Sequence, residues 1–118
     1  MKTKQLKNKE MSSEVYALRR QVINLIHEAK NLVPNLPRIN VRVTDNHRDI
    51  AGMGRIGGKV IWITEKFVAN REVVFHEILH AIGIGHIESN PLMKSGCVIG
   101  LSKTVCDKEF MKLAKGAL

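Results

Sequence analysis

HEILHAIGIGH, residues 76–86, lies in a segment whose apolar side chains recur at helical spacing. With about 100° per residue, a helix over about residues 71–82 has two different faces. One face is apolar and predicts contact with a core; it holds Val74, Phe75, Ile78, Leu79, Ala81 and Ile82. The other holds His76, Glu77 and His80. Because the two histidines are one turn apart, their imidazoles can reach one ion, and Glu77 falls on the same side.

His86 cannot join these residues from the same helix. Continuing the helix would carry it roughly 120° round and about 9 Å along the axis from His80. Gly83 stands where helices commonly end in a left-handed residue, a conformation that glycine adopts at little cost. We therefore expect the helix to end at Gly83 and His86 to turn back toward His76 and His80.

Three neutral imidazoles are a ligand set typical of catalytic zinc, because they leave the fourth tetrahedral position open for water. Zinc lowers the pKa of that water to about 7, and a nearby carboxylate can accept its proton. The sequence therefore predicts one catalytic Zn²⁺ held by His76, His80 and His86, with Glu77 as general base.

The spacing HExxHxxGxxH over residues 76–86, followed by Asn90-Pro91-Leu92-Met93-Lys94, resembles the metzincin zinc peptidases. That family has a turn after the motif with a methionine beneath the metal, and Met93 is at the matching position. The resemblance implies a small zinc-dependent endopeptidase that hydrolyses peptide or protein substrates. It also implies that Gly83 and Met93 support the site structurally.

Three segments before the metal helix have the pattern of strands. Residues 38–44 alternate between apolar and polar side chains. Residues about 50–56 and 59–64 flank Gly57-Gly58 and predict an antiparallel hairpin, since both turn positions can take positive φ. The first arm contains glycines that permit close approach of another backbone, which makes it a candidate edge strand for binding an extended peptide. The candidate substrate-binding residues are Gly52, Met53 and Gly54.

Two further helices complete the expected fold. The first begins at Ser12 or Ser13 and ends before Pro34, with apolar residues at steps of three and four. The last covers about residues 104–115. We expect an α+β fold of the zincin type, in which a small mixed sheet of about three strands packs with an N-terminal, a metal-binding and a C-terminal helix.

The 118 residues, with 44% apolar and 25% charged side chains, are typical of one globular domain. We expect a flexible basic arm over residues 1–11 and a single domain over 12–118. No segment has the pattern of a signal peptide or a membrane span, so we expect a cytoplasmic protein without a membrane partner. Cys97 and Cys106 are accordingly expected to be reduced thiols.

The net charge of +8 leaves two other functions open. Residues 1–42 carry nine Lys/Arg against three Asp/Glu, so nucleic acid could bind this basic region. One alternative is a metal-dependent endoribonuclease that resembles a bacterial family of ribosomal RNA maturation with the same histidine spacing. That family does not place glutamate after the first histidine, so Glu77 favours peptide hydrolysis. The second alternative is an inactive zinc-binding interaction module.

Overall fold

A computed structural model of the chain describes residues 2–44, 52–96 and 100–118. Within them the elements follow in the order α1 (Lys2–Leu32), β1 (Asn40–Thr44), β2 (Gly52–Gly54), β3 (Val60–Thr64), the 3-10 helix η1 (Glu65–Phe67), α2 (Arg71–Ala81) and α3 (Lys103–Ala117). Cys97 and the first two residues of the predicted strand 50–56 lie outside the described ranges. The mixture of helices and strands is that of the expected α+β class.

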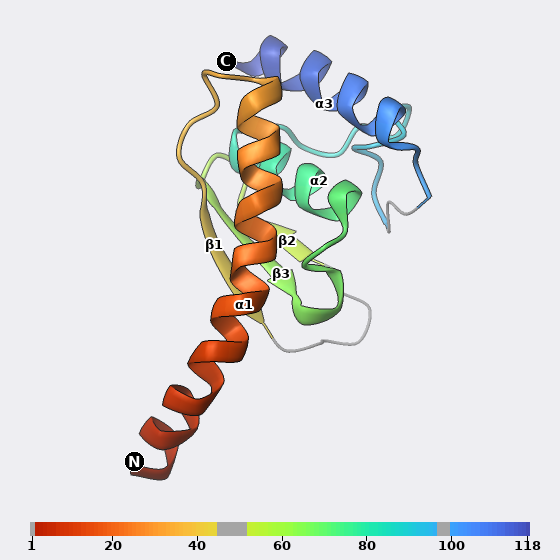
Figure 1. Cartoon of the computed structure of the whole chain (residues 1–118). Coiled ribbons are helices and arrows are strands. Elements are labelled where there is room, and N and C mark those ends of the chain that lie inside the picture. The colour runs from red at the N-terminus through yellow and green to blue at the C-terminus, as the bar shows by residue number, and fades with distance from the viewer. Residues whose placement is uncertain (1, 45–51, 97–99) are drawn as a thin grey trace.

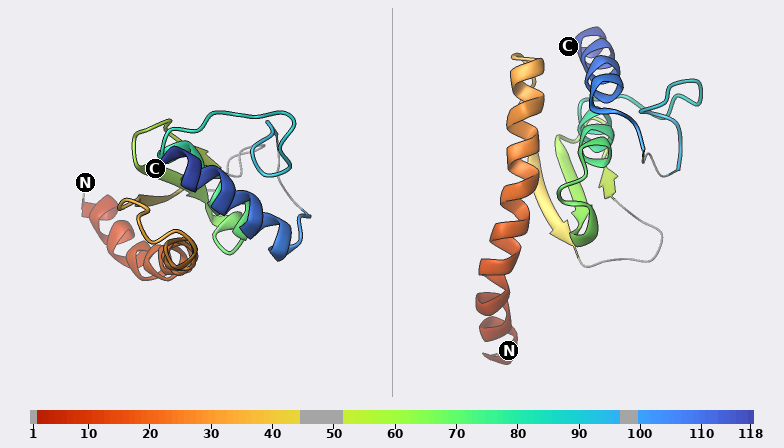
Figure 2. Two further views of the ribbon diagram at one scale, coloured as in Figure 1. Left: turned by 90° about the horizontal axis from the view of Figure 1, so that it is seen from above. Right: turned by 45° about the vertical axis from the view of Figure 1, so that its right-hand side comes forward.

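The sheet has the order β1-β3-β2, with β1 parallel and β2 antiparallel to the central strand β3. Val41, Ile61 and Ile63 are buried, whereas Arg42, between two inward-facing residues of β1, is exposed. α1 and α2 lie on the same side of the sheet, and α3 packs against α2 (Figures 1 and 2). The prediction of a small mixed sheet of three strands packed with three helices is confirmed.

α1 is longer than predicted. Its 31 residues begin at Lys2, so residues 2–11, which we expected to form a flexible arm, are helical. These residues contain neither glycine nor proline, and lysine, glutamine, leucine and methionine all favour helix. The N-terminal end of α1 extends beyond the sheet (Figure 1). The remainder of α1 packs on the core through Val22, Leu25 and Ala29, and Val33 joins the core directly after the helix ends.

The antiparallel hairpin is present, but its turn differs from the predicted two-residue turn. Arg55 N still pairs with Val60 O at 3.4 Å, so four residues, 56–59, form the connection. Gly57 takes the positive φ expected there, at +74°, and Lys59 does so at +57°. Their amides are used elsewhere: Gly57 N donates to His80 O at 2.9 Å, and Lys59 N donates to Ala81 O at 3.1 Å. The hairpin turn therefore caps the C-terminal end of α2, which explains its greater length.

Arg71 joins the three helices. Its Nε and Nη2 donate to the two carboxylate oxygens of Asp107 at 2.8 and 3.1 Å, and its Nη1 donates to Glu28 of α1. Its guanidinium carbon lies 4.7 Å from the ring centre of Phe75, which in turn packs against Phe110 with 4.5 Å between centroids. A forked, charge-assisted pair of this kind fixes the orientation of α2 between α1 and α3.

Both site-flanking helices begin at side-chain caps. Asn70 Oδ1 accepts from Val73 N at 3.0 Å at the start of α2, and Ser102 Oγ accepts from Val105 N at 3.2 Å at the start of α3. Of the helices in the described part of the chain, none has the length and apolar character that crossing a membrane requires.

Candidate metal centre

α2 has the two faces that its spacing predicts, and both are covered. On the core side Val74, Phe75, Ile78 and Leu79 are fully buried. On the other side His76, Glu77 and His80 expose only 5%, 6% and 7% of their surfaces. Burial of three polar side chains costs free energy unless each gains a partner, so this face of α2 is organised for something other than packing.

Gly83 ends α2 in the expected way. Its φ is +110°, Gly83 N donates to His80 O at 3.0 Å, and Ile84 N donates to Leu79 O at 3.0 Å. These two bonds form a Schellman motif, which closes the last turn of the helix and reverses the chain. A β-carbon at Gly83 would meet nothing within 4 Å, so the backbone angle alone makes glycine the favoured residue.

The reversal brings the third histidine to the other two. His76, His80 and His86 each offer a ring nitrogen, and these nitrogens all lie within 4.8 Å of one another. The Nε2 atoms of His80 and His86 are 3.2 Å apart. Zinc bonded to imidazole nitrogens at about 2.0–2.1 Å would hold two of them roughly 3.3 Å apart in tetrahedral geometry. The three side chains could therefore hold one metal ion, with the exposed His86 on the solvent side.

The two buried histidines are held by main-chain carbonyls. His76 Nδ1 lies 2.6 Å from Leu92 O, and His80 Nδ1 lies 2.7 Å from Ile84 O. Each Nδ1 therefore carries the proton, which leaves Nε2 with its lone pair toward the centre of the cluster. Burial lowers the pKa of both rings and outweighs the carbonyl bonds, which would raise it. Both imidazoles are thus kept neutral, as metal binding requires.

Glu77 is the anomalous side chain of this site. Its Oε1 is buried and is the one such side-chain atom, among the described residues, without a hydrogen-bond partner. Burial raises the pKa of the Glu77 carboxyl to about 7. A buried carboxyl group with a free oxygen and a pKa near neutrality is suited to exchange a proton with a water molecule.

The edge strand β2 contributes to this environment. Gly52 lies so close to α2 that a β-carbon on it would be 3.1 Å from Cγ of Glu77. The strand therefore covers the carboxylate and helps to remove it from solvent. In the described part of the sheet, β2 pairs on one side only, with β3. The other edge of Gly52–Gly54 therefore has no partner strand in the described part of the sheet, and an extended chain could pair there.

The segment after His86 forms a compact turn. Ile87 N donates to Met93 O at 2.8 Å, and Lys94 N donates to Asn90 O at 3.0 Å. Met93 is fully buried, and the carbonyl of the preceding Leu92 is the partner of His76. The turn therefore supports the cluster from the side of His76. The expectation that Met93 lies beneath the ion stays a prediction of the family resemblance.

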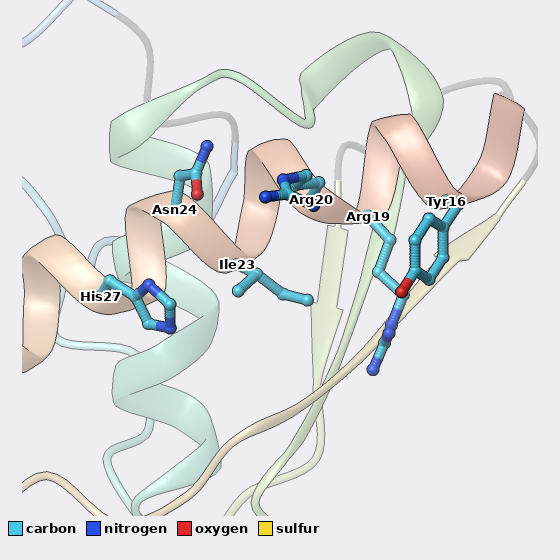
Figure 3. A pocket seen from close by; sticks show the side chains of 6 residues that line it. All are labelled: Tyr16, Arg19, Arg20, Ile23, Asn24 and His27. Carbon is cyan, nitrogen blue, oxygen red and sulfur yellow. The ribbon is translucent and has the colours of Figure 1, made fainter. Parts of the chain in front are cut away.

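A second surface feature lies on α1, away from the histidine cluster. A shallow depression is lined by side chains of one face of this helix: Tyr16, Arg19, Arg20, Ile23, Asn24 and His27 (Figure 3). Arg19 Nε donates to Val41 O of β1 at 3.3 Å, which fixes the helix along the outer strand. The two arginines give this surface the basic character expected of the N-terminal region.

Cys106 is buried in α3, and burial raises the pKa of its thiol to about 12. The thiol is therefore protonated and unreactive at neutral pH. The expectation that Cys97 is also a reduced thiol lies outside the described residues.

No protein family, curated protein or solved structure matches this chain. The resemblance to metzincins rests on the motif residues alone and stays a prediction.

The sequence reasoning missed the carbonyl partners of the histidines and the residue that organises the turn, Asn90. Main-chain carbonyls carry no residue-specific signal. Asn90 did leave one, since an asparagine before proline commonly starts a turn with its side chain bonded to following amides.

Proposed function

We propose that the chain is a zinc-dependent endopeptidase with His76, His80 and His86 as metal ligands and Glu77 as general base. The observation that carries the proposal is the buried, unpartnered Oε1 of Glu77, the residue that directly follows His76 of the three-histidine cluster in α2. A merely structural zinc site has four protein ligands and needs no free carboxylate beside it.

In the proposed reaction, zinc and Glu77 have different roles. Zinc, when bound, supplies an acidified water and polarises the carbonyl oxygen of the substrate. Glu77 accepts the proton from the attacking water and returns it to the amine that leaves when the peptide bond breaks. With its pKa near 7, the Glu77 carboxyl can both take and release that proton close to neutral pH.

The substrate would bind as an extended chain along β2. Main-chain groups of this edge strand can pair with a peptide whatever its side chains are, and the strand covers the general base. A peptide added there would therefore run past Glu77, which is the relationship that hydrolysis of an internal bond requires.

A metal-dependent endoribonuclease is the second candidate, and the depression on α1 favours it. Arg19 and Arg20 line this depression, and arginine binds phosphate well. An inactive zinc-binding module is a third candidate, but it leaves the free carboxylate of Glu77 without a role.

The deciding experiment compares substrates. Zinc-loaded protein is incubated with a peptide library blocked at both ends and with structured RNA, each with and without chelator. We expect chelator-sensitive cleavage of internal peptide bonds and intact RNA. Cleavage of RNA alone would replace the peptidase by the nuclease, and cleavage of neither would favour the inactive module.

A further inference from the structure

Asn90 uses all the polar atoms of a buried side chain. It exposes 7% of its surface in the turn between His86 and α3. Its Oδ1 accepts from Leu92 N at 2.8 Å and from Met93 N at 3.0 Å, and its Nδ2 donates to Glu109 Oε1 at 2.9 Å. An asparagine that is buried and hydrogen-bonded through both its oxygen and its nitrogen fixes the backbone that it contacts.

One peptide group connects Asn90 to a proposed metal ligand. The Met93 N–H bonded to Asn90 and the Leu92 C=O bonded to His76 Nδ1 belong to the same planar peptide unit. Because N–H and C=O point in opposite directions across a trans peptide, fixing one fixes the other. The orientation of the His76 ring is therefore determined through a rigid unit by the side chain of Asn90.

Glu109 of α3 determines which way the amide of Asn90 faces. The glutamate oxygen can only accept, so the NH₂ of Asn90 must face it and the oxygen of Asn90 must face the two turn amides. Glu109 is itself held by Lys112 Nζ at 2.8 Å. The chain of contacts thus runs from α3 through Glu109, Asn90 and one peptide group to His76.

We propose that Asn90 is a positioning residue that presents His76 to the metal, and that Glu109 sets its orientation. This rests on the proposed metal site but not on the identity of the substrate. Its role is distinct from filling the core, because the contacts of Asn90 end on the ring that would bind the ion rather than on apolar side chains.

The test measures the affinity of the purified chain for Co²⁺, followed by the visible absorption of tetrahedral cobalt. Asn90→Ala should bind Co²⁺ about 10- to 100-fold more weakly, the usual effect of removing an outer-shell partner. Asn90→Asp keeps the oxygen for the turn amides but opposes one carboxylate to another, so it should also bind more weakly. In the double variant Asn90→Asp with Glu109→Gln, the amide at position 109 can donate to the carboxylate at position 90. The hydrogen bond is thus restored with donor and acceptor exchanged, and most of the Co²⁺ affinity should be recovered.

A matched control separates positioning from general stability. Ser102→Ala removes the cap of α3, the helix that carries Glu109, and should lower the free energy of unfolding without changing Co²⁺ affinity or absorption. Asn90→Ala with unchanged affinity and spectrum would overturn the proposal. The proposal would also be overturned if the double variant bound Co²⁺ no more tightly than Asn90→Asp alone. Asn90→Asp is isosteric, so it should fold even if Asn90→Ala does not.

Failure of the peptidase proposal has a different signature. If the unsubstituted protein cleaves no peptide, the cobalt affinities of the variants still decide the role of Asn90. If the unsubstituted protein binds no cobalt, both the metal site and the positioning role are overturned.

Discussion

Gly52 of β2 lies directly against the proposed general base, Glu77 of α2. A β-carbon on Gly52 would come 3.1 Å from Glu77 Cγ, and equally close to Ile63 Cδ1 and to the main-chain oxygen of Trp62. The Trp62 oxygen cannot yield without disturbing β3. Even one methyl group must therefore push β2 away from α2 or move Glu77.

Gly52→Ala should consequently lower both stability and activity. We expect a loss of about 1–3 kcal/mol in the free energy of unfolding, as for other overpacked sites. Peptide turnover should fall by about 10- to 100-fold, because the carboxylate is displaced from its working position. Urea denaturation and peptide hydrolysis measure the two effects.

The control for this variant is Gly116→Ala. A β-carbon there meets nothing within 4 Å, and Gly116 is in a helix, so the substitution should be neutral or add up to about 1 kcal/mol of stability. Turnover by Gly52→Ala at the rate of the unsubstituted protein would show that β2 does not constrain Glu77.

Glu77→Gln should strongly lower turnover while leaving metal binding intact. Removing the base should lower kcat by about 10²- to 10⁴-fold. Without metal, the variant should also be more stable than the unsubstituted protein at pH 7 and above, with a higher urea midpoint. Burial raises the folded-state pKa of Glu77 to about 7, above its unfolded value of about 4.3, so the folded state loses stability as the pH rises from about 4.3 through 7. The glutamine cannot ionise.

Glu72→Gln is the matched control for Glu77→Gln. It neutralises another carboxylate of α2, one that accepts from Gly100 N at 3.2 Å rather than facing the histidines. It should retain full turnover. Equal loss of activity in both variants would remove Glu77 from the mechanism.

His80→Ala should abolish binding of stoichiometric metal. With three nitrogens converging on one point, we expect about one zinc per chain for the unsubstituted protein, and removal of one ligand leaves too few to hold it. Metal content after gel filtration provides the measurement. His27→Ala, on the exposed surface of α1, should retain one zinc; a His80→Ala protein that also does so would refute the ligand set.

Asp107→Asn should make the protein less stable in a way that depends on pH. Burial alone would raise the pKa of the Asp107 carboxyl, but the hydrogen bonds from Arg71 and Lys103 outweigh it and leave the pKa below its usual value. The carboxylate therefore contributes stability above the unfolded pKa of about 3.9, and this contribution is lost as the pH falls through the lower folded pKa.

The difference between Asp107→Asn and the unsubstituted protein should therefore be about 2 kcal/mol at pH 7 and should shrink below about pH 4. Urea denaturation across this range measures it. Glu14→Gln removes an exposed carboxylate of α1 and should show no such difference. If the difference in the free energy of unfolding were the same at every pH, the contribution of Asp107 would come from its packing and not from its charge.

The faces of α2 could be predicted because helical spacing is a local property of the sequence. The end of the helix at Gly83 could be predicted for the same reason, because very few residue types readily adopt the left-handed conformation that ends a helix. The bond between Asn90 and Glu109 could not be predicted, because Glu109 is 19 residues away and is brought near only by the packing of α3.

Two predictions were wrong for different reasons, one local and one long-range. The lysines of residues 2–11 suggested a solvated arm, yet their helical preference governs the backbone. Gly57-Gly58 suggested a two-residue turn, yet the amides of this connection are needed at the end of α2, a contact that no local pattern contains.

The main-chain oxygen of His80 is where these distant pieces of chain meet. It accepts from Gly57 N of the hairpin turn and from Gly83 N of the reversing chain, at 2.9 and 3.0 Å. The hairpin and the loop that carries His86 are thus joined at one atom by main-chain hydrogen bonds that need no metal ligand. The free energy of metal binding is then not needed to order the chain. A protein with this arrangement should therefore stay folded when a chelator removes the metal and with it the activity.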